Sequence, residues 1–289
     1  METPAEARTT HRIEHETRYD YPGPVTLSVQ EIRLTPRLRP HGQELEVEPA
    51  GQLRFFRDAF ENPVHAYERI GETRSLRVVN RLRLTRARDN PFDFLLAPGA
   101  EKLPVDYPAG QRAALAPFAR ETTPGQPGSE EAARAILPPE TETVEFLVAL
   151  TRAIHDRFDY EARDEPGIRS PGELLAAGKG SCRDFAALLA ALLRHAGFAA
   201  RFVSGYLLET GDLEGADSLH AWTETYLPGA GWKGLDPTNG VFCDDSFVPC
   251  AVGVAGEDAA PVIGRYYADR PVASSLTTTL RIRTEGEAG

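Results

Sequence analysis

The residues of this chain best suited to covalent chemistry are one cysteine and, further along, one histidine and one aspartate. Cys182 follows the flexible run Gly-Lys-Gly-Ser at 178–181 and comes directly before an apolar segment. His220 and Asp236 lie in two later segments that are joined by the turn Pro-Gly-Ala-Gly at 228–231. A nucleophilic thiol needs a base within hydrogen-bond reach, and that base needs an acceptor that orients it. The three residue types therefore predict a nucleophile, a general base and an orienting carboxylate.

A helix predicted from Cys182 to His195 would place the thiol at its N-terminus. The apolar residues after Cys182 recur every three or four positions, and Gly197 follows as a stop signal. Unpaired backbone N–H groups and the helix dipole at that end favour the thiolate over the thiol. Taken singly, each residue also has an ordinary interpretation. The cysteine could be a small buried apolar residue, His220 a structural histidine, and Asp236 a turn aspartate before a proline.

The segments that carry the histidine and the aspartate alternate as strands do. Residues 218–227 predict a strand on which four side chains share one face: His220, Trp222, Glu224 and Tyr226. A second strand is predicted over 232–236, so pairing across the short turn would bring His220 beside Asp236. Another strand, 198–208, comes directly after the cysteine helix. The order helix, strand, hairpin predicts an α+β fold with an antiparallel sheet.

The N-terminal part of the chain has a different pattern. Six or so short alternating runs with turn residues between them occupy residues 10–86, which predicts a small β-sandwich. Three further helices are predicted: 110–119, 140–158 and 171–176. We therefore expect a β-sandwich domain over 1–95, an irregular proline-rich connector over 96–139 and a catalytic α+β domain over 140–289. A last alternating strand at 274–283 could return to either sheet.

The composition narrows the functional classes. The chain has 289 residues and a formal net charge of −11, which disfavours nucleic acid or an anionic membrane as a partner. No apolar run approaches the ~20 residues that a membrane span needs, and the first residues lack an apolar signal core, so we expect a cytoplasmic protein. Three cysteines are too few for a disulfide framework, and the spacing of Cys243 and Cys250 does not favour a metal site. No phosphate-binding glycine loop is present, so no cofactor is expected.

Four motifs in the second half of the chain carry a family resemblance. In order they are Gly-Ser-Cys-Arg-Asp-Phe at 180–185, Ala-Arg-Phe-Val-Ser-Gly-Tyr at 200–206, His-Ala-Trp-Thr-Glu-Thr-Tyr-Leu-Pro-Gly at 220–229, and Gly-Trp-x-x-x-Asp-Pro-Thr-Asn at 231–239. They resemble the transglutaminase core. Four N-terminal motifs resemble the N-terminal region of the bacterial transglutaminase-like cysteine protease family: Tyr-x-Tyr at 19–21, Arg-Leu-x-Pro at 33–36, Arg-Asp-x-Phe-x-Asn at 57–62 and Asn-Pro-Phe at 90–92. The resemblance extends over nearly the whole chain.

The resemblance implies a papain-like α+β core in which Cys182, His220 and Asp236 form a catalytic triad. It implies acyl transfer from a peptide or glutamine-type amide through a thioester, with a peptide or protein as the substrate. Hydrolysis is the leading expectation, because no further domains for docking an amine donor are evident in the sequence. Transfer to an amine, as in a protein-glutamine transglutaminase, is one alternative. A non-catalytic peptide-binding module is another, which the intact triad disfavours.

Four further residues are expected around the triad. Trp222 would shield the imidazole and the carboxylate from water, and Tyr206 could form a pocket wall. Arg183 and Glu224 are interpreted as ion partners that support the site. The backbone N–H of Cys182 is the expected first donor of an oxyanion hole.

Overall fold

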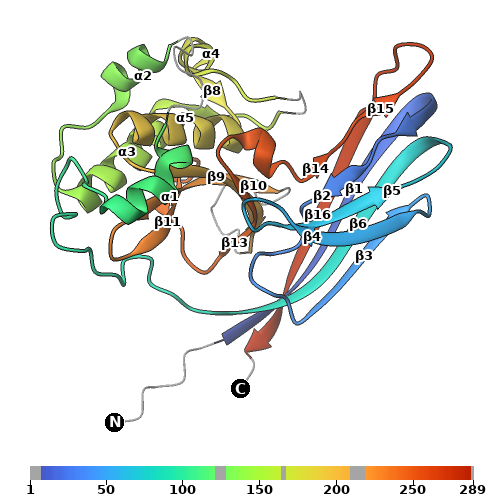
Figure 1. Ribbon diagram of the computed structural model, residues 1–289, viewed down its shortest axis with the longest axis horizontal. Helices are drawn as coiled ribbons and strands as arrows, with labels where there is room; N and C mark the ends of the chain where they lie inside the picture. Colours follow the sequence, from blue (N-terminus) through green and yellow to red (C-terminus); the bar gives the residue numbers. More distant parts are fainter. Residues whose placement is uncertain (1–7, 121–127, 164–166, 209–218, 288–289) are drawn as a thin grey trace.

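The computed structural model describes residues 8–120, 128–163, 167–208 and 219–287. Figure 1 shows two regions side by side: a body in which helices surround a sheet, and a group of long strands. The long strands come from both ends of the chain, so the N- and C-terminal segments lie together in space. The architecture is α+β with antiparallel sheets, as the sequence predicts.

Two sheets form the predicted β-sandwich. The N-terminal strands are β1 (Arg8–Leu27), β2 (Gln30–Ile32), β3 (Gly42–Glu48), β4 (Gln52–Arg57), β5 (Pro63–Glu68) and β6 (Glu72–Ala87). Strands β1, β6 and β3 pair in one sheet, and β2, β5 and β4 pair in the other. Alternating apolar side chains from both sheets, among them Ile32 and Tyr67 on one side and Leu76 and Val78 on the other, fill the space between them.

The last strands of the chain complete these two sheets. They are β14 (Val262–Ile263), β15 (Tyr266–Tyr267) and β16 (Ser275–Glu287). Strand β14 pairs with β2, while β15 and β16 pair with β1. The strand predicted over 274–283 therefore joins the N-terminal sheet. Domain boundaries at 95 and 139 stay a prediction, and the strand pairing assigns residues 262–287 to the sandwich rather than to the second sheet.

The connector is more regular than predicted. Besides the expected helix α1 (Ala109–Ala119), it contains a second helix, α2 (Ser129–Ile136). Glu130 and Glu131 lie in the first turn of α2, where the helix dipole favours them, and Ala132, Ala133 and Ile136 are buried. The high proline content of the connector predicted no helix here. The helix is too short to give a clear periodic pattern, and packing of its buried side chains stabilises it.

The second region packs helices against an antiparallel sheet. The helices are α3 (Thr143–Arg157), α4 (Pro171–Ala177) and α5 (Cys182–His195). The sheet has the strand order β12-β11-β10-β9-β13, with β9 (Ala200–Leu207), β10 (His220–Leu227), β11 (Gly231–Asp236), β12 (Val241–Phe242) and β13 (Phe247–Gly253). Two short elements, β7 (Asp159–Tyr160) and β8 (Lys179–Gly180), pair in parallel, and η1 (Gly256–Ala259) follows β13.

Helix α5 lies close against the sheet because small residues face each other. Ala186 of the helix packs with Ala221 of β10 and Ala251 of β13. The hydroxyl of Thr223 donates to the Ala186 carbonyl at 2.7 Å, which ties the helix to β10. On its other side, the helix buries leucines against α3. The cysteine helix is therefore fixed from both sides relative to the strand that begins at His220.

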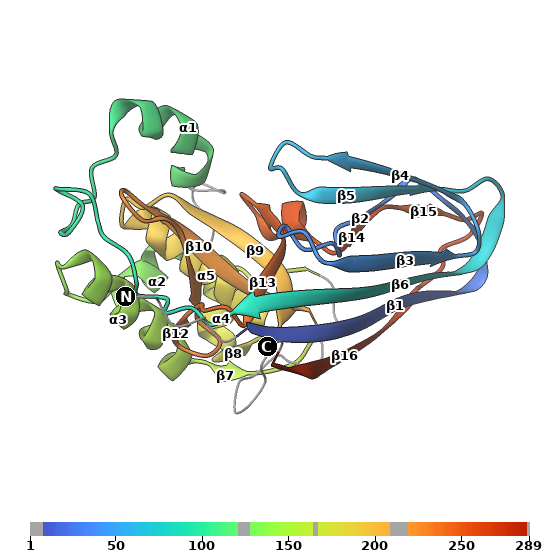
Figure 2. The same cartoon turned by 90° about the horizontal axis from the view of Figure 1, so that it is seen from below.

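The long strands of the sandwich also support the second sheet. Figure 2 shows β1, β6 and β16 extending from the sandwich to the strands of the second region. Ile13 and Leu82 pack there with Val248 and with Tyr206. Buried Asn80 of β6 donates to the Leu34 carbonyl at 2.7 Å and to the Tyr206 hydroxyl at 3.1 Å, so a polar contact joins the two sheets within this apolar cluster.

We predict that Asn80→Ala lowers the free energy of unfolding by about 1–3 kcal/mol, because the buried Leu34 carbonyl and the Gln43 amide, which donates to Asn80 at 2.9 Å, lose a partner. Urea unfolding followed by circular dichroism measures the change. Gln52→Ala, on the exposed strand β4, is the matched control and should leave stability unchanged. A loss below about 0.5 kcal/mol for Asn80→Ala would contradict a structural role for this contact.

Candidate active site

Cys182 is the first residue of helix α5, as predicted, and is partly exposed. Asp184, in the first turn, is fully buried and fixes this end of the helix. Its carboxylate accepts hydrogen bonds from the backbone N–H and the hydroxyl of Ser181, both at 2.9 Å. Asp184 therefore fixes the position of Ser181, the residue directly before Cys182.

Two arginines complete the surroundings of the Asp184 carboxylate. Arg163 donates through Nη1 at 2.9 Å in a nearly buried ion pair, and the backbone N–H of Arg169 donates at 2.8 Å. A buried carboxylate without these partners would destabilise the fold by several kcal/mol. The start of α5, and with it the position of Cys182, is consequently held by several contacts to one buried carboxylate.

His220 and Asp236 form a buried pair at the ends of two neighbouring strands. His220 begins β10 and Asp236 ends β11, and the pairing of Thr223 with Leu235 sets the register that brings them together. His220 Nε2 and Asp236 Oδ2 are 2.9 Å apart, and neither side chain is exposed to solvent. The cross-strand arrangement expected from the sequence is present.

The turn after β11 orients the Asp236 carboxylate. The backbone N–H of Thr238 donates to Oδ1 at 2.9 Å, and Asn239 Nδ2 donates to Oδ2 at 2.6 Å. His155, near the end of α3, contacts the Thr238 carbonyl through Nδ1 at 2.8 Å. The sequence reasoning missed Asn239 and His155 as supports. Asn239 lies within the quoted motif Asp-Pro-Thr-Asn, whereas nothing in the sequence links His155 to that turn.

The electrostatics of the pair favour a charged imidazole. Burial opposes the charge on His220, but the Asp236 carboxylate, its hydrogen bond and the Cys182 side chain outweigh that effect and raise the pKa of His220 to about 10. The other ring nitrogen, Nδ1, is buried and has no hydrogen-bond partner of ordinary geometry among the described residues. Because Nε2 is occupied by Asp236, Nδ1 is the nitrogen available to the thiol.

Two aromatic rings lie beside the imidazole. Trp222 stacks at 6.3 Å between ring centroids, and Phe247 lies at 6.2 Å. The Trp222 side chain is almost fully buried, so it excludes water from one side of the imidazole. This position fits the shielding expected of Trp222. Phe247 was not anticipated, because it reaches the site from β13, a strand distant in sequence.

The other predicted residues lie elsewhere. Glu224 pairs with Arg201 on the same strand face as His220, further along the sheet. Arg183 donates to the carbonyls of Gly167 and Arg163 and thus supports the segment beside α5. Tyr206 is buried in the contact with the sandwich, where its hydroxyl donates to the Leu34 carbonyl, and its role as a pocket wall stays a prediction.

The remaining cysteines are in environments unsuited to nucleophilic chemistry. Cys250 is buried in the contact with the sandwich, and burial raises its pKa. Burial and the nearby Asp236, Glu224 and Asp244 carboxylates raise the pKa of Cys243 well above its ordinary value. In the described part of the chain, no group of three or more histidine, cysteine or acidic side chains could hold a metal ion. Nor is any helix there long and apolar enough to cross a membrane.

Sequence comparison agrees with the motifs and the fold. Residues 130–237 match the transglutaminase-like superfamily, and residues 11–85 match the bacterial transglutaminase-like N-terminal region. An uncharacterised protein of Mycobacterium tuberculosis is 30% identical, over 92% of this chain and 90% of its own length. The chain belongs to the transglutaminase-like superfamily. The residues quoted from the sequence therefore mark a family relationship over both regions.

Two other similarities are more limited. A crystal structure of a candidate cysteine protease from Cytophaga hutchinsonii matches 96% of this chain and 91% of its own, with a TM-score of 0.72 at 19% identity. That similarity concerns the fold. A protein-glutamine gamma-glutamyltransferase of Pseudomonas aeruginosa is 31% identical over 43% of this chain and 20% of its own length.

We predict that iodoacetamide near pH 7 alkylates Cys182 at least about tenfold faster than Cys243 or Cys250, because a helix N-terminus favours the thiolate whereas the pKa values of the other two thiols are raised. Peptide mass spectrometry over a time course gives the three rates. Cys182→Ala should remove the fast phase and leave the slow ones unchanged. Equal rates at all three positions would argue against a reactive Cys182.

Proposed function

We propose that this transglutaminase-like protein is a thiol-dependent hydrolase of peptide or amide bonds, with Cys182 as nucleophile, His220 as acid and base, and Asp236 as the orienting carboxylate. The observation that carries the proposal is the buried pair of His220 and Asp236. The Cys182 side chain also contributes to the raised pKa of His220. A buried imidazolium held by a carboxylate is suited to sustaining a neighbouring thiolate.

The proposed chemistry proceeds through a thioester. The Cys182 thiolate attacks the carbonyl carbon of the scissile amide, and the His220 imidazolium gives its proton to the departing amine. The backbone N–H of Cys182 would donate to the developing oxyanion, because N–H groups at a helix start have no partner within the helix. Water then attacks the thioester carbonyl and gives its proton to His220, and departure of the Cys182 thiolate releases a carboxylic acid and restores the thiolate–imidazolium pair.

Transfer to an amine differs only in the second half of this sequence. A primary amine in place of water would yield a new amide, as in a protein-glutamine transglutaminase. The partial similarity to the Pseudomonas aeruginosa gamma-glutamyltransferase keeps this second candidate open. Both reactions share the thioester, so only the fate of the acyl group separates them.

We predict ammonia release from a glutamine-containing peptide, or cleavage of a peptide bond, without incorporation of a labelled primary amine. Mass spectrometry of the peptide products separates water from amine as the acceptor. Stable amine incorporation as the main product would replace hydrolysis by transglutamination.

Cys182→Ala should reduce either reaction by at least about a thousandfold, the size of loss expected when a triad nucleophile is removed. Cys243→Ala is the matched control and should keep most of the activity. Turnover by Cys182→Ala close to that of the wild type would contradict the assignment of the nucleophile. Absence of both reactions across a broad peptide library, with no trapped thioester, would favour the non-catalytic binding module.

A further inference from the structure

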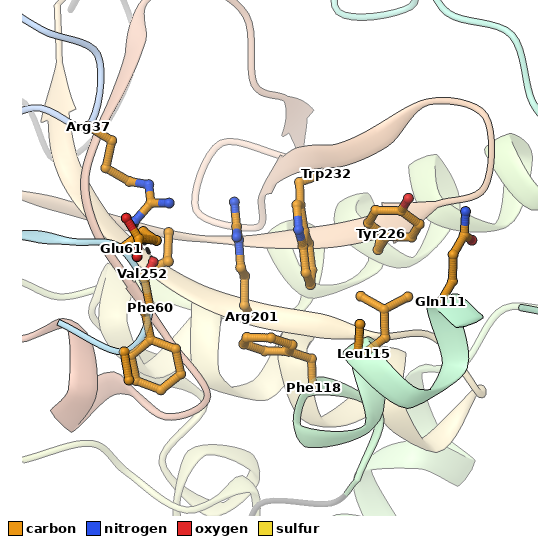
Figure 3. Close-up of a pocket in the computed structure, with 12 residues that line it drawn as sticks. Arg37, Phe60, Glu61, Gln111, Leu115, Phe118, Arg201, Tyr226, Trp232 and Val252 are labelled. Atoms are coloured by element: carbon orange, nitrogen blue, oxygen red, sulfur yellow. Dashed lines mark hydrogen bonds between the residues drawn. The ribbon is translucent and has the colours of Figure 1, made fainter. Parts of the chain in front are cut away.

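A cavity of about 420 Å³ lies on one face of the second sheet, and Cys182 does not line it. Its floor is formed by Arg201 of β9, Tyr226 of β10 and Trp232 of β11. Helix α1 covers one side, and the tip of the β4–β5 hairpin closes the other (Figure 3). Its size is that of a site for a small ligand. None of the three proposed triad residues lines it.

The hairpin wall of the cavity is fixed in place. Buried Asn62 accepts from the backbone N–H of Val252 at 2.9 Å and donates to its carbonyl at 2.8 Å. Asp58 accepts from the Asn62 side chain at 3.0 Å and from the Phe60 N–H at 2.9 Å. The motif Arg-Asp-x-Phe-x-Asn at 57–62 thus docks the hairpin on β13 and places Phe60 in the cavity.

The cavity wall is aromatic and apolar opposite that tip. Phe118 of α1 contacts Trp232 edge to face at 5.2 Å and lies 6.2 Å from Phe60, between ring centroids. Leu115 of α1 is buried against the same space. These side chains offer a surface for an apolar group of moderate size.

Two guanidinium groups line the cavity and differ in their partners. Arg201 is paired with Glu224 and stacks on Trp232, with its guanidinium carbon 4.1 Å from the ring centroid. Arg37 donates through Nη1 to two neutral oxygens, those of the Phe60 carbonyl and the Asn62 side chain. Burial and the nearby Arg201 lower the pKa of Arg37, although the Glu224 and Asp58 carboxylates act in the opposite direction.

One end of the cavity holds a buried acceptor. Gln111 Oε1 is withdrawn from solvent and has no hydrogen-bond partner among the described residues. Figure 3 shows Gln111 and Arg37 at the two ends of the row of lining side chains, with the aromatic groups between them. A buried acceptor without a partner is destabilising, so a ligand N–H at this place would be favourable.

We propose that this cavity binds the C-terminal end of a peptide, with the carboxylate on Arg37, an apolar side chain against Phe118 and Trp232, and a backbone N–H donated to Gln111. Arginine pairs with carboxylates more strongly than with neutral acceptors, which makes the anionic end of a peptide the natural partner of Arg37. The proposal does not depend on the proposed hydrolase activity.

The test measures binding of N-acetyl-alanyl-phenylalanine and of its C-terminal carboxamide by isothermal titration calorimetry. The full chain carrying Cys182→Ala is used, so that turnover cannot consume the ligand. The acid should bind with a dissociation constant at or below about 1 mM, and the carboxamide at least about tenfold more weakly. Equal binding of the two compounds, or no saturable binding of the acid up to about 10 mM, would overturn the proposal.

Two variants probe the cavity independently. Arg37→Gln removes the charge, and Ala114→Phe adds bulk to the cavity wall at an exposed position of α1. Each should weaken binding of the acid at least about tenfold. Arg54→Gln, on exposed β4 of the same hairpin, is the matched control and should bind as the parent does. Unchanged binding by Ala114→Phe would overturn the location, even if Arg37→Gln disturbed the hairpin.

Discussion

The buried pair between His220 and Asp236 is the interaction on which the rest of the site depends. A single charge at that depth would cost several kcal/mol, so each group keeps its charged form only in the presence of the other. The carboxylate is further occupied by the Thr238 N–H and the Asn239 amide, which leaves no acceptor without a donor nearby. The register of β10 on β11 and the turn after Asp236 must therefore be correct together, because a shift in either would leave a buried charge unbalanced.

The β-sandwich packs on the second sheet and thereby supports the candidate site. Strands β1 and β6 pack on the second sheet, and the β4–β5 hairpin docks on β13 through Asn62. Strand β13 carries Phe247, which lies beside the His220 ring, so contacts from the sandwich reach the site through one strand. The sandwich also supplies Phe60 and Arg37 to the cavity on the sheet face. Both regions thus shape the surfaces on which chemistry or binding is proposed.

Local patterns in the sequence were sufficient for the elements that carry the site. The apolar spacing after Cys182 and the alternation around His220 predicted a helix and a strand, and Asp236 followed from the short turn between two strands. Non-local contacts were not predictable in this way. The pairing of β16 with β1, the contact of His155 with Thr238 and the approach of Phe247 join segments distant in sequence, and no local period encodes them. Helix α2 was missed because it is short and because its stability depends on the burial of a few side chains.

The most direct test of the central pair is the titration of His220, followed by NMR of protein with ¹⁵N-labelled histidine. Because its pKa is raised to about 10, the imidazolium form should persist as the pH rises through 7 and 8 and be lost only near the raised value. In Asp236→Asn, the ring should lose its proton at a lower pH, because burial then acts without the compensating charge. A wild-type His220 that is already neutral at pH 7 would contradict the account.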